Sequence, residues 1–424
     1  MSAAPATLAQ RVTAAPLVHD PARAEAVTAA LTPALREGAL GALLRGAAGS
    51  SPYLSRSIER HVDWLAKTAE RPPETALAAL LAETAATTEG VDRAALAKAL
   101  RQTKSRAALL IALADLGGVW SLTEVTAALS DLAEAALQTA VAWLLAEEHR
   151  QARLPGLDDA RLAQGAGYTV IAMGKLGARE LNYSSDIDLI CLFDQDRYAP
   201  ADYAAVKARF IAVTRALVKL LSDQTADGYV FRTDLRLRPT PSTTPVCLAM
   251  EAAERYYEAV GRTWERAAHI KARTVAGDIA AGERYLKRLT PFVWRRHLDF
   301  AAIEDIHGLL RKIRTTRAKS CPGAVAGHDI KLDPGGIREI EFFAQTRQLI
   351  AGGRDPSLRE PTTLGALSAL ARAGTIDTET AERLSADYTA HRTLEHRLQM
   401  IGDAQTQTIP SGEDARARVA ALSA

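Results

Sequence analysis

Apolar side chains in the first 150 residues recur at the spacing of an α-helix. Between residues 122 and 132 they fall three and four positions apart, so they share one helical face. Ser121 and Glu124 match the capping box that begins many helices. The same apolar stripe occurs in three earlier stretches: 57–69, 74–86 and 92–116. We therefore expect the N-terminal third of the chain to be helical.

The hydrophobic period changes after residue 155. Residues 168–173 and 186–193 are short runs rich in apolar and β-branched side chains, which favours strands. A helical pattern follows at 202–222, and residues 229–238 alternate polar and apolar positions as a third strand would. We therefore expect a small sheet with a crossover helix.

Helical periodicity returns from residue 249, breaks at 327–336, and ends in a long helix whose shared face includes Leu384 and Leu398. These patterns predict an α+β fold, in which a predominantly helical chain surrounds a central sheet. The expected units are a helical domain at 1–150, a sheet-containing domain at 151–298 and a C-terminal helical domain at 299–424.

Composition and charge narrow the possible partners. The 424 residues are 48% hydrophobic and 24% charged, which is typical of a globular chain and excludes disorder along its whole length. Lys and Arg number 52 against 50 Asp and Glu, a net charge of +2. A surface that coats nucleic acid or anionic lipid carries a larger excess. We therefore expect neither nucleic acid nor a membrane as a partner.

Cysteine spacing and the N-terminus indicate the compartment. Cys191, Cys247 and Cys321 are far apart and in no CxxC pattern, which excludes a disulfide framework and a zinc finger. Residues 1–30 lack the apolar core of a signal peptide, and no stretch reaches the ~18 uncharged apolar residues of a membrane span. The expected location is the cytoplasm.

Acidic and basic side chains share one face of the expected sheet. Asp186 and Asp188 are two positions apart in a strand, so both carboxylates project to the same side. In the third expected strand, Asp234, Arg236 and Arg238 alternate with leucines. If the strands are neighbours, three carboxylates converge beside two guanidinium groups. Carboxylate oxygens hold Mg²⁺ and arginines bind phosphate, as phosphoryl transfer requires.

The segment before Asp186 adds candidates for phosphate or nucleotide binding. Gly174 ends a strand and permits close approach of the backbone, and Lys175 offers a positive charge. Ser184 and Ser185 directly precede the carboxylates. The spacing differs from a Walker A loop. An Asp-x-Asp or Arg-x-Arg pattern alone is more often a solvated strand edge or face. The prediction of a phosphoryl-transfer site therefore rests on the combination of these patterns with the glycine turn.

Three further features have two interpretations each. Lys331 precedes the 334–336 glycine turn, which is either a phosphate site at a helix N-terminus or an ordinary helix entry. The 284–319 stretch has an excess of seven basic residues, which form either a solvated face or a contact for an acidic protein. Four charged residues either line a cleft or form structural ion pairs: Glu265, Arg266, Lys271 and Arg273.

The glycine turn, the Asp-x-Asp pair and the third aspartate resemble the metal site of the DNA polymerase β-like nucleotidyltransferase superfamily. Longer segments closely resemble the bifunctional glutamine synthetase adenylyltransferase/adenylyl-removing enzymes. The matching segments are MGKLGARELNYSSDIDLI (173–190), TDLRLRP (233–239), GRTWERAAHIKAR (261–273) and DIKLDPGGIREIEFF (329–343). The resemblance extends from about Tyr168 to the C-terminus.

That resemblance implies a specific activity. The family has two related modules in tandem, and ELNYSSDIDLI is similar to the N-terminal one, so we expect an isolated N-terminal half. That module removes AMP from adenylylated glutamine synthetase by phosphorolysis, which consumes inorganic phosphate and releases ADP. The implied cofactors are two Mg²⁺ ions on Asp186, Asp188 and Asp234. The implied regulatory partner is the PII signal protein.

Alternatives remain at this stage. The same metal site would serve an adenylyltransferase that attaches AMP from ATP to glutamine synthetase, or a nucleotidyltransferase acting on RNA or an antibiotic. A non-enzymatic module that senses nitrogen-signalling proteins is a further possibility. One residue and one segment depart from the resemblance. Lys175 stands where the superfamily commonly has Ser or Gly, and residues 240–246 replace a glycine-containing turn.

Overall fold

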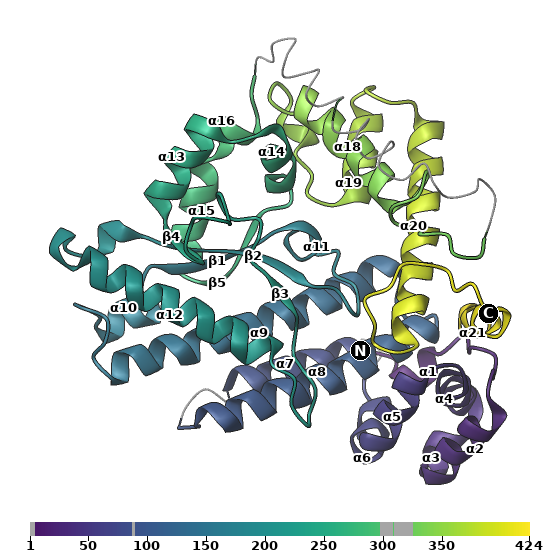
Figure 1. Ribbon diagram of the computed structural model, residues 1–424. Helices are drawn as coiled ribbons and strands as arrows, with labels where there is room; N and C mark the ends of the chain where they lie inside the picture. Colours follow the sequence, from purple (N-terminus) through teal and green to yellow (C-terminus); the bar gives the residue numbers. More distant parts are fainter. Residues whose placement is uncertain (1–4, 87–89, 297–307, 309–324) are drawn as a thin grey trace.

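A five-stranded mixed sheet lies between layers of helices in the computed structural model (Figure 1), which describes residues 5–86, 90–296, 308 and 325–424. The α+β prediction is confirmed. The strands are β1 (Tyr168–Ala172), β2 (Ile187–Phe193), β3 (Thr233–Asp234), β4 (Cys247–Ala249) and β5 (Arg273–Gly277).

Strand β2 is central to the sheet. One edge of β2 pairs antiparallel with β1, which in turn pairs antiparallel with β5. The other edge pairs in parallel with β3 near its start and with β4 near its end. The register places Asp188 beside Asp234 and Cys191 beside Cys247. Both cysteines are free and buried, and Cys191 and Cys247 are the two that the described residues contain.

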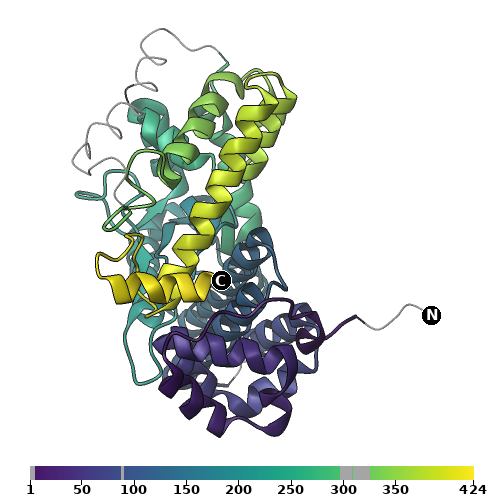
Figure 2. The same cartoon turned by 90° about the vertical axis from the view of Figure 1, so that its right-hand side faces the viewer.

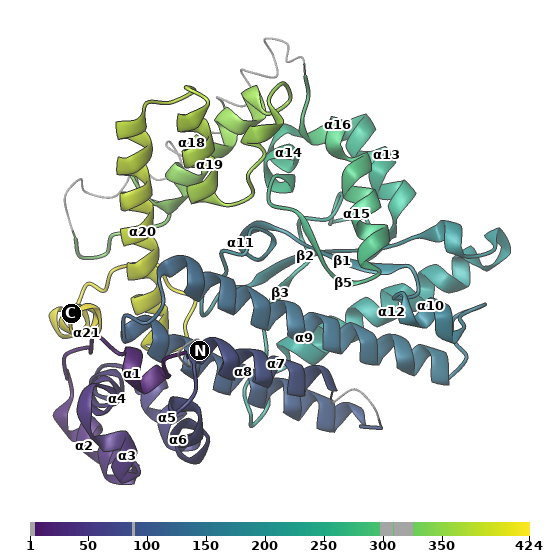
Figure 3. The same cartoon turned by 180° about the vertical axis from the view of Figure 1, so that it is seen from behind.

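Alternating residues of β2 enter two different cores. Ile187 and Leu189 belong to the cluster beneath α9 (Leu122–Arg150) and α12 (Tyr203–Ser222). Ile190 and Leu192 enter the opposite cluster, which residues of α13–α16 complete. Figure 3 shows α9 running along the sheet, where it contacts β5. The helices of the second face are α13 (Met250–Val260), α14 (Thr263–His269), α15 (Ile279–Arg288) and α16 (Thr290–Val293).

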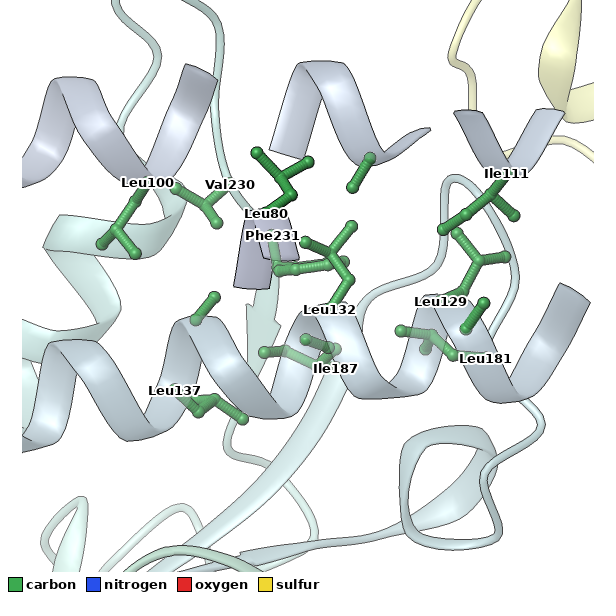
Figure 4. Close-up of a cluster of buried hydrophobic side chains, with 14 of the residues drawn as sticks. Leu80, Leu100, Ile111, Leu129, Leu132, Leu137, Leu181, Ile187, Val230 and Phe231 are labelled. Atoms are coloured by element: carbon green, nitrogen blue, oxygen red, sulfur yellow. The ribbon is translucent and has the colours of Figure 1, made fainter. Parts of the chain in front are cut away.

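The helices expected in the N-terminal third are present. Figure 4 shows leucines of this block packing against Ile187 of β2 and Phe231, so its core continues into the sheet. The backbone N–H of Ser121 donates to Glu124 Oε2 at 2.7 Å, which confirms the capping box. The helices before α9 are α1 (Leu8–Arg11), α2 (Pro21–Ala30), α3 (Pro33–Arg36), α4 (Gly38–Ser50), α5 (Pro52–Arg60), α6 (Val62–Ala69), α7 (Pro73–Ala86) and α8 (Arg93–Leu116).

Helix α20 (Thr378–Met400) joins the two ends of the molecule (Figure 2). It packs against α18 (Ile337–Ala351) and α19 (Thr363–Arg372), and its last turn reaches the N-terminal helices. There Ser51 Oγ donates to the Met400 carbonyl at 2.7 Å. One continuous core cluster thus includes residues from the first and last helices. The division at residues 150 and 298 stays a prediction.

Several elements differ from the sequence-based expectation. The strand predicted at 229–238 has only two residues, Thr233 and Asp234, and residues 236 and 237 form a turn. Strands β4 and β5 lie within regions expected to be loop or helix. A further helix, α21 (Glu413–Ser423), follows the predicted long helix. The remaining short elements are α10 (Asp159–Ala163), α11 (Gly174–Gly177), η1 (Gln195–Arg197), η2 (Pro200–Asp202) and η3 (Pro356–Leu358).

Two further expectations concern the surface. No helix among the described residues is long and apolar enough to cross a membrane. Of the basic 284–319 stretch, residues 297–307 and 309–319 lie outside the described part of the chain, as does Cys321.

Candidate active site

Three aspartates meet at the start of β2. Asp188 and Asp234 are register partners on adjacent parallel strands, and Asp186 lies two residues before Asp188 on the same face. Burial, followed by the negative charges of Asp234 and Asp186, raises the pKa of Asp188 to about 6. The structure therefore brings the three predicted carboxylates close enough to repel one another.

Two of the three carboxylates, Asp186 and Asp234, each form an ion pair with an arginine. Arg232 Nε donates to Asp186 Oδ1 at 2.8 Å. Arg236 donates its backbone N–H to Asp234 Oδ1 and its Nε to Asp234 Oδ2, both at 2.8 Å. Hydrogen bonds from the Arg236 side chain are the main reason that the pKa of Asp234 is lowered. Asp188 is left as the carboxylate with the least compensation.

The three aspartates do not form a preassembled metal cluster. Across the residues that the structure describes, no three His, Cys, Asp or Glu side chains stand where they could hold one ion together. Asp186 and Asp234 instead face their arginines. The donor set nevertheless fits a hard divalent cation, because all ligands are carboxylate oxygens and the half-buried Asp188, repelled by Asp234 and Asp186, forms no ion pair with any described residue. The residues thus suit Mg²⁺ once the arginine pairs open.

The glycine turn lies directly against Asp188. Gly174 begins the short helix α11 with φ +54°, a conformation that glycine adopts without strain. A Cβ placed on Gly174 would lie 3.0 Å from Asp188 Oδ2. The Met173 N–H also donates to the Asp188 carbonyl at 2.9 Å. The structure therefore places Gly174 at the carboxylates, as the sequence predicts.

Lys175 has a different position from the one expected of a free phosphate ligand. Its Nζ lies 3.0 and 3.1 Å from the two carboxylate oxygens of Glu395 in α20. Lys331 forms no ion pair with the three aspartates in the described part of the chain, but its positive charge acts to lower the pKa of both Asp188 and Lys175. The adjoining glycine turn is an ordinary helix entry, in which the Gly335 N–H donates to Glu339.

Ser184 forms hydrogen bonds that hold the segment before Asp186 in place. Its N–H donates to Gln399 Oε1 at 3.1 Å, and its hydroxyl donates to the Asp403 carbonyl at 3.0 Å. Its own carbonyl accepts from Arg232. Ser185 is partly exposed beside Asp186. Ser184 is thus committed to structure, and Ser185 is the serine that solvent reaches.

Arg236 and Arg238 do not act as a pair. Because strand β3 ends at Asp234, the alternation that would place both on one face stops there. The Arg236 side chain is 83% exposed at the carboxylates. The Arg238 guanidinium instead donates to four backbone carbonyls in residues 235–245. The expectation that Arg238 binds phosphate is therefore corrected: it holds the loop that follows β3.

Arg232 is a site residue that the sequence analysis missed. Besides Asp186, it contacts Tyr229, whose hydroxyl accepts from Nη1 at 2.8 Å. Arg232 lies two positions before Asp234, so the alternation predicted for residues 229–238 places both side chains on one face and could have identified Arg232.

The four ambiguous charged residues are structural. Arg266 is buried and donates to the Phe292 and Val293 carbonyls. Lys271 lies 2.8 Å from Glu180 and 2.9 Å from Glu341. The other two make similar internal contacts: Glu265 with the Arg262 N–H, and Arg273 with Glu134.

A mixed sheet with an Asp-x-Asp strand, a third aspartate in register and a glycine turn defines the nucleotidyltransferase class. Family models place the chain within that class. Residues 41–288 match the model described as glutamate-ammonia ligase adenylyltransferase, and residues 308–423 match the model described as GlnD PII-uridylyltransferase. Because the first match covers more than half of the chain, the protein belongs to the glutamate-ammonia ligase adenylyltransferase family.

Three curated relatives share one name, bifunctional glutamine synthetase adenylyltransferase/adenylyl-removing enzyme. The protein from Xanthobacter autotrophicus is 48% identical over 414 residues, which are 95% of this chain and 42% of the relative. One from a Bradyrhizobium strain is 47% identical over 97% of this chain and 43% of the relative. One from Mesorhizobium japonicum is 44% identical over 95% and 42%. The chain thus spans less than half the length of these relatives.

Proposed function

We propose that this chain removes AMP from the adenylylated tyrosine of glutamine synthetase by phosphorolysis and releases ADP. The observation that carries the proposal is the register of Asp188 with Asp234, with Asp186 two residues earlier on the same face. Three carboxylates at one strand start suit two Mg²⁺ ions. The name shared by the relatives supports glutamine synthetase as the substrate.

The proposed reaction needs no protein nucleophile, because inorganic phosphate is itself the attacking group. An oxygen of inorganic phosphate forms a bond to the phosphorus of the AMP group. The bond from that phosphorus to the tyrosyl oxygen breaks, and the tyrosyl oxygen takes up a proton equivalent to the one that hydrogen phosphate loses. Phosphate joined to AMP is ADP, so the nucleotide product identifies the route. Hydrolysis would instead release AMP.

The chain's own residues bind and orient the two anions. The exposed Arg236 lies beside the carboxylates, and Lys331 acts on the same site from the 325–336 segment. These cations offset the charge of phosphate and of the AMP group. Divalent cations, when bound by the three aspartates, would stabilise the charge on the attacking and leaving oxygens. Gly174 leaves the space beside Asp188 free of a side chain.

The direction of the reaction is supported by resemblance. The ELNYSSDIDLI segment is similar to the AMP-removing module of the family. One site geometry serves both directions, so attachment of AMP from ATP is the alternative that an assay must separate. The PII signal protein is a proposed partner on the same ground.

A paired assay tests the proposal. The chain is incubated with adenylylated glutamine synthetase and phosphate, and separately with unmodified glutamine synthetase and ATP, each with Mg²⁺. We expect phosphate-dependent release of ADP in the first mixture and none with the Asp188→Asn variant. AMP as the main product, or activity without phosphate, would contradict phosphorolysis. Labelling of unmodified glutamine synthetase from ATP would reverse the direction.

A further inference from the structure

Helix α20 holds the segment that connects the glycine turn to the aspartates. Arg392 Nη2 donates to the Glu180 carbonyl at 2.7 Å, and Gln399 accepts from the Ser184 N–H. At the beginning of this segment, Lys175 pairs with Glu395. The partners are more than 200 residues apart in the sequence. The position of the segment therefore depends on a helix outside the sheet.

We infer that Glu395 is a positioning residue, which fixes the Lys175 ammonium group and thereby holds the glycine turn against Asp188. Little of either side chain reaches solvent: Glu395 is buried with its side chain 2% exposed, and that of Lys175 is 13% exposed. A buried carboxylate and ammonium persist only when each compensates the other. Glu395 also lies 3.4 Å from Arg392 in its own helix, so two cations fix its orientation.

The charges around Lys175 show what Glu395 contributes. Although burial opposes ionisation, Lys175 and Arg392 lower the pKa of Glu395 to about 2. Burial lowers the pKa of Lys175 to about 8, and Glu395 opposes that shift. The other charged groups that act on Lys175 are Arg392, Lys331 and Glu341. Glu395 is thus the principal group that keeps Lys175 charged at neutral pH.

Loss of the Glu395 charge has a specific consequence. Lys175 would then face the positive charges of Arg392 and Lys331, which Glu341 offsets in part, so its pKa would fall further. The ammonium would lose its proton within the neutral range, and the turn would lose its ion pair with α20. Affinity for an anion beside the turn would then weaken as the pH rises.

Two measurements on Glu395→Gln test this inference. The first is hydrogen exchange in the peptide covering residues 173–185, which requires no assumption about activity. The second is the pH dependence of KM for phosphate, between about pH 6 and pH 9, which rests on the proposed function. Glu148→Gln is the matched control, because Glu148 is a buried carboxylate in the last turn of α9, where it pairs with Arg153 and Arg209 and not with any residue of the site.

We expect the backbone amides of residues 173–185 to exchange about tenfold faster in Glu395→Gln than in the wild-type protein. A loss of interaction free energy equal to one pKa unit would change the local opening equilibrium by this factor. KM for phosphate should rise more than kcat falls, with the largest effect at alkaline pH. Glu395→Asp, which retains the charge, should restore part of both. Unchanged exchange and KM, or equal changes in Glu148→Gln, would overturn the inference. If wild-type protein shows no phosphorolysis, the exchange result alone decides.

A second variant covers the case in which Glu395→Gln fails to fold. Lys175→Met combined with Glu395→Met replaces the buried pair with apolar side chains of similar size, a change that buried ion pairs often tolerate. We expect this double variant to fold and to show a raised KM for phosphate without the wild-type pH dependence. A wild-type KM and pH profile would contradict a role for the positioned ammonium group.

Discussion

Asp188 and Asp234 lie side by side in register on parallel strands, and only Asp234 has an arginine bonded to it. Asp186 likewise has Arg232. The three carboxylates are thus unequal in the absence of a cation. Asp188 is half-buried, and desolvation together with the two neighbouring carboxylates disfavours its ionised form, so it is the residue at which substitution best separates stability from activity.

Asp188→Asn should abolish activity and raise Tm in cation-free buffer. The amide removes a half-buried charge that two neighbouring carboxylates repel. The raised pKa of Asp188 sets an upper limit of about 3 kcal/mol on the unfolding free energy gained. Mg²⁺ should raise the Tm of the wild-type protein and leave that of the variant nearly unchanged. Thermal melts in EDTA and in Mg²⁺ measure both effects.

Asp186→Asn is the matched comparison for Asp188→Asn. It also removes a carboxylate from the site, but it breaks the ion pair with Arg232. We therefore expect loss of activity without a rise in Tm. Equal Tm changes in the two variants would contradict the unequal charge balance described above.

Arg236→Ala should affect phosphate binding, whereas Arg238→Ala should affect stability. Arg236 is exposed beside the carboxylates, so its loss should leave Tm nearly unchanged and raise KM for phosphate. Arg238 holds four carbonyls of the loop after β3, and its loss should cost about 1–3 kcal/mol of unfolding free energy. Chemical denaturation and steady-state kinetics on both variants separate the roles. A similar loss of stability in both would contradict the assignment.

Local patterns predicted the elements whose signal is contained in a short stretch of sequence. The capping box at Ser121 and the apolar run at 168–173 were sufficient for α9 and β1. Strand β3 was predicted too long, because alternation continues through Leu235 and Leu237 although the backbone turns after Asp234. Turning there allows Arg238 to satisfy the loop carbonyls, a tertiary gain that alternation does not encode.

The same distinction applies to the site. Alternation within one strand brought Asp186 and Asp188 to one face, and the third aspartate followed from an identical argument. The burial of Lys175 was not predictable, because its partner Glu395 is 220 residues away and no spacing links the two. Sequence patterns identify which groups share a face, whereas the partners of buried charges depend on how distant helices pack.

Gly174→Ala should impair metal binding and activity more than stability. The added Cβ would lie 3.0 Å from Asp188 Oδ2 and would displace that carboxylate. Gly374→Ala is the matched control, because Gly374 also has positive φ but has nothing within 4 Å of an added Cβ. Each should cost about 1 kcal/mol of stability from backbone strain. Only Gly174→Ala should weaken the Mg²⁺-dependent rise in Tm, and the same rise in both variants would contradict the contact.

His269 provides a prediction about the pH dependence of stability. Its ring is buried in α14 against Tyr257, and Nδ1 lies 2.8 Å from the Glu265 carbonyl. Burial, partly opposed by that backbone bond, lowers the pKa of His269 to about 4. The unfolded chain, with a pKa near ~6.5, therefore binds the proton first. The stabilisation is fully present above about pH 6.5 and is lost as the pH falls towards 4.

His269→Asn should remove this dependence, because the amide can occupy the Nδ1 position and does not titrate. Between about pH 7 and pH 4.5, the unfolding free energy of the wild-type protein should fall by about 2–3 kcal/mol more than that of the variant. His391→Asn is the matched control, since His391 makes the same contact to the carbonyl four residues earlier, Asp387, at a solvent-accessible position of α20. Denaturant titrations at both pH values measure the difference. Parallel pH profiles for wild-type protein and His269→Asn would show that the buried ring does not destabilise the fold by taking up a proton.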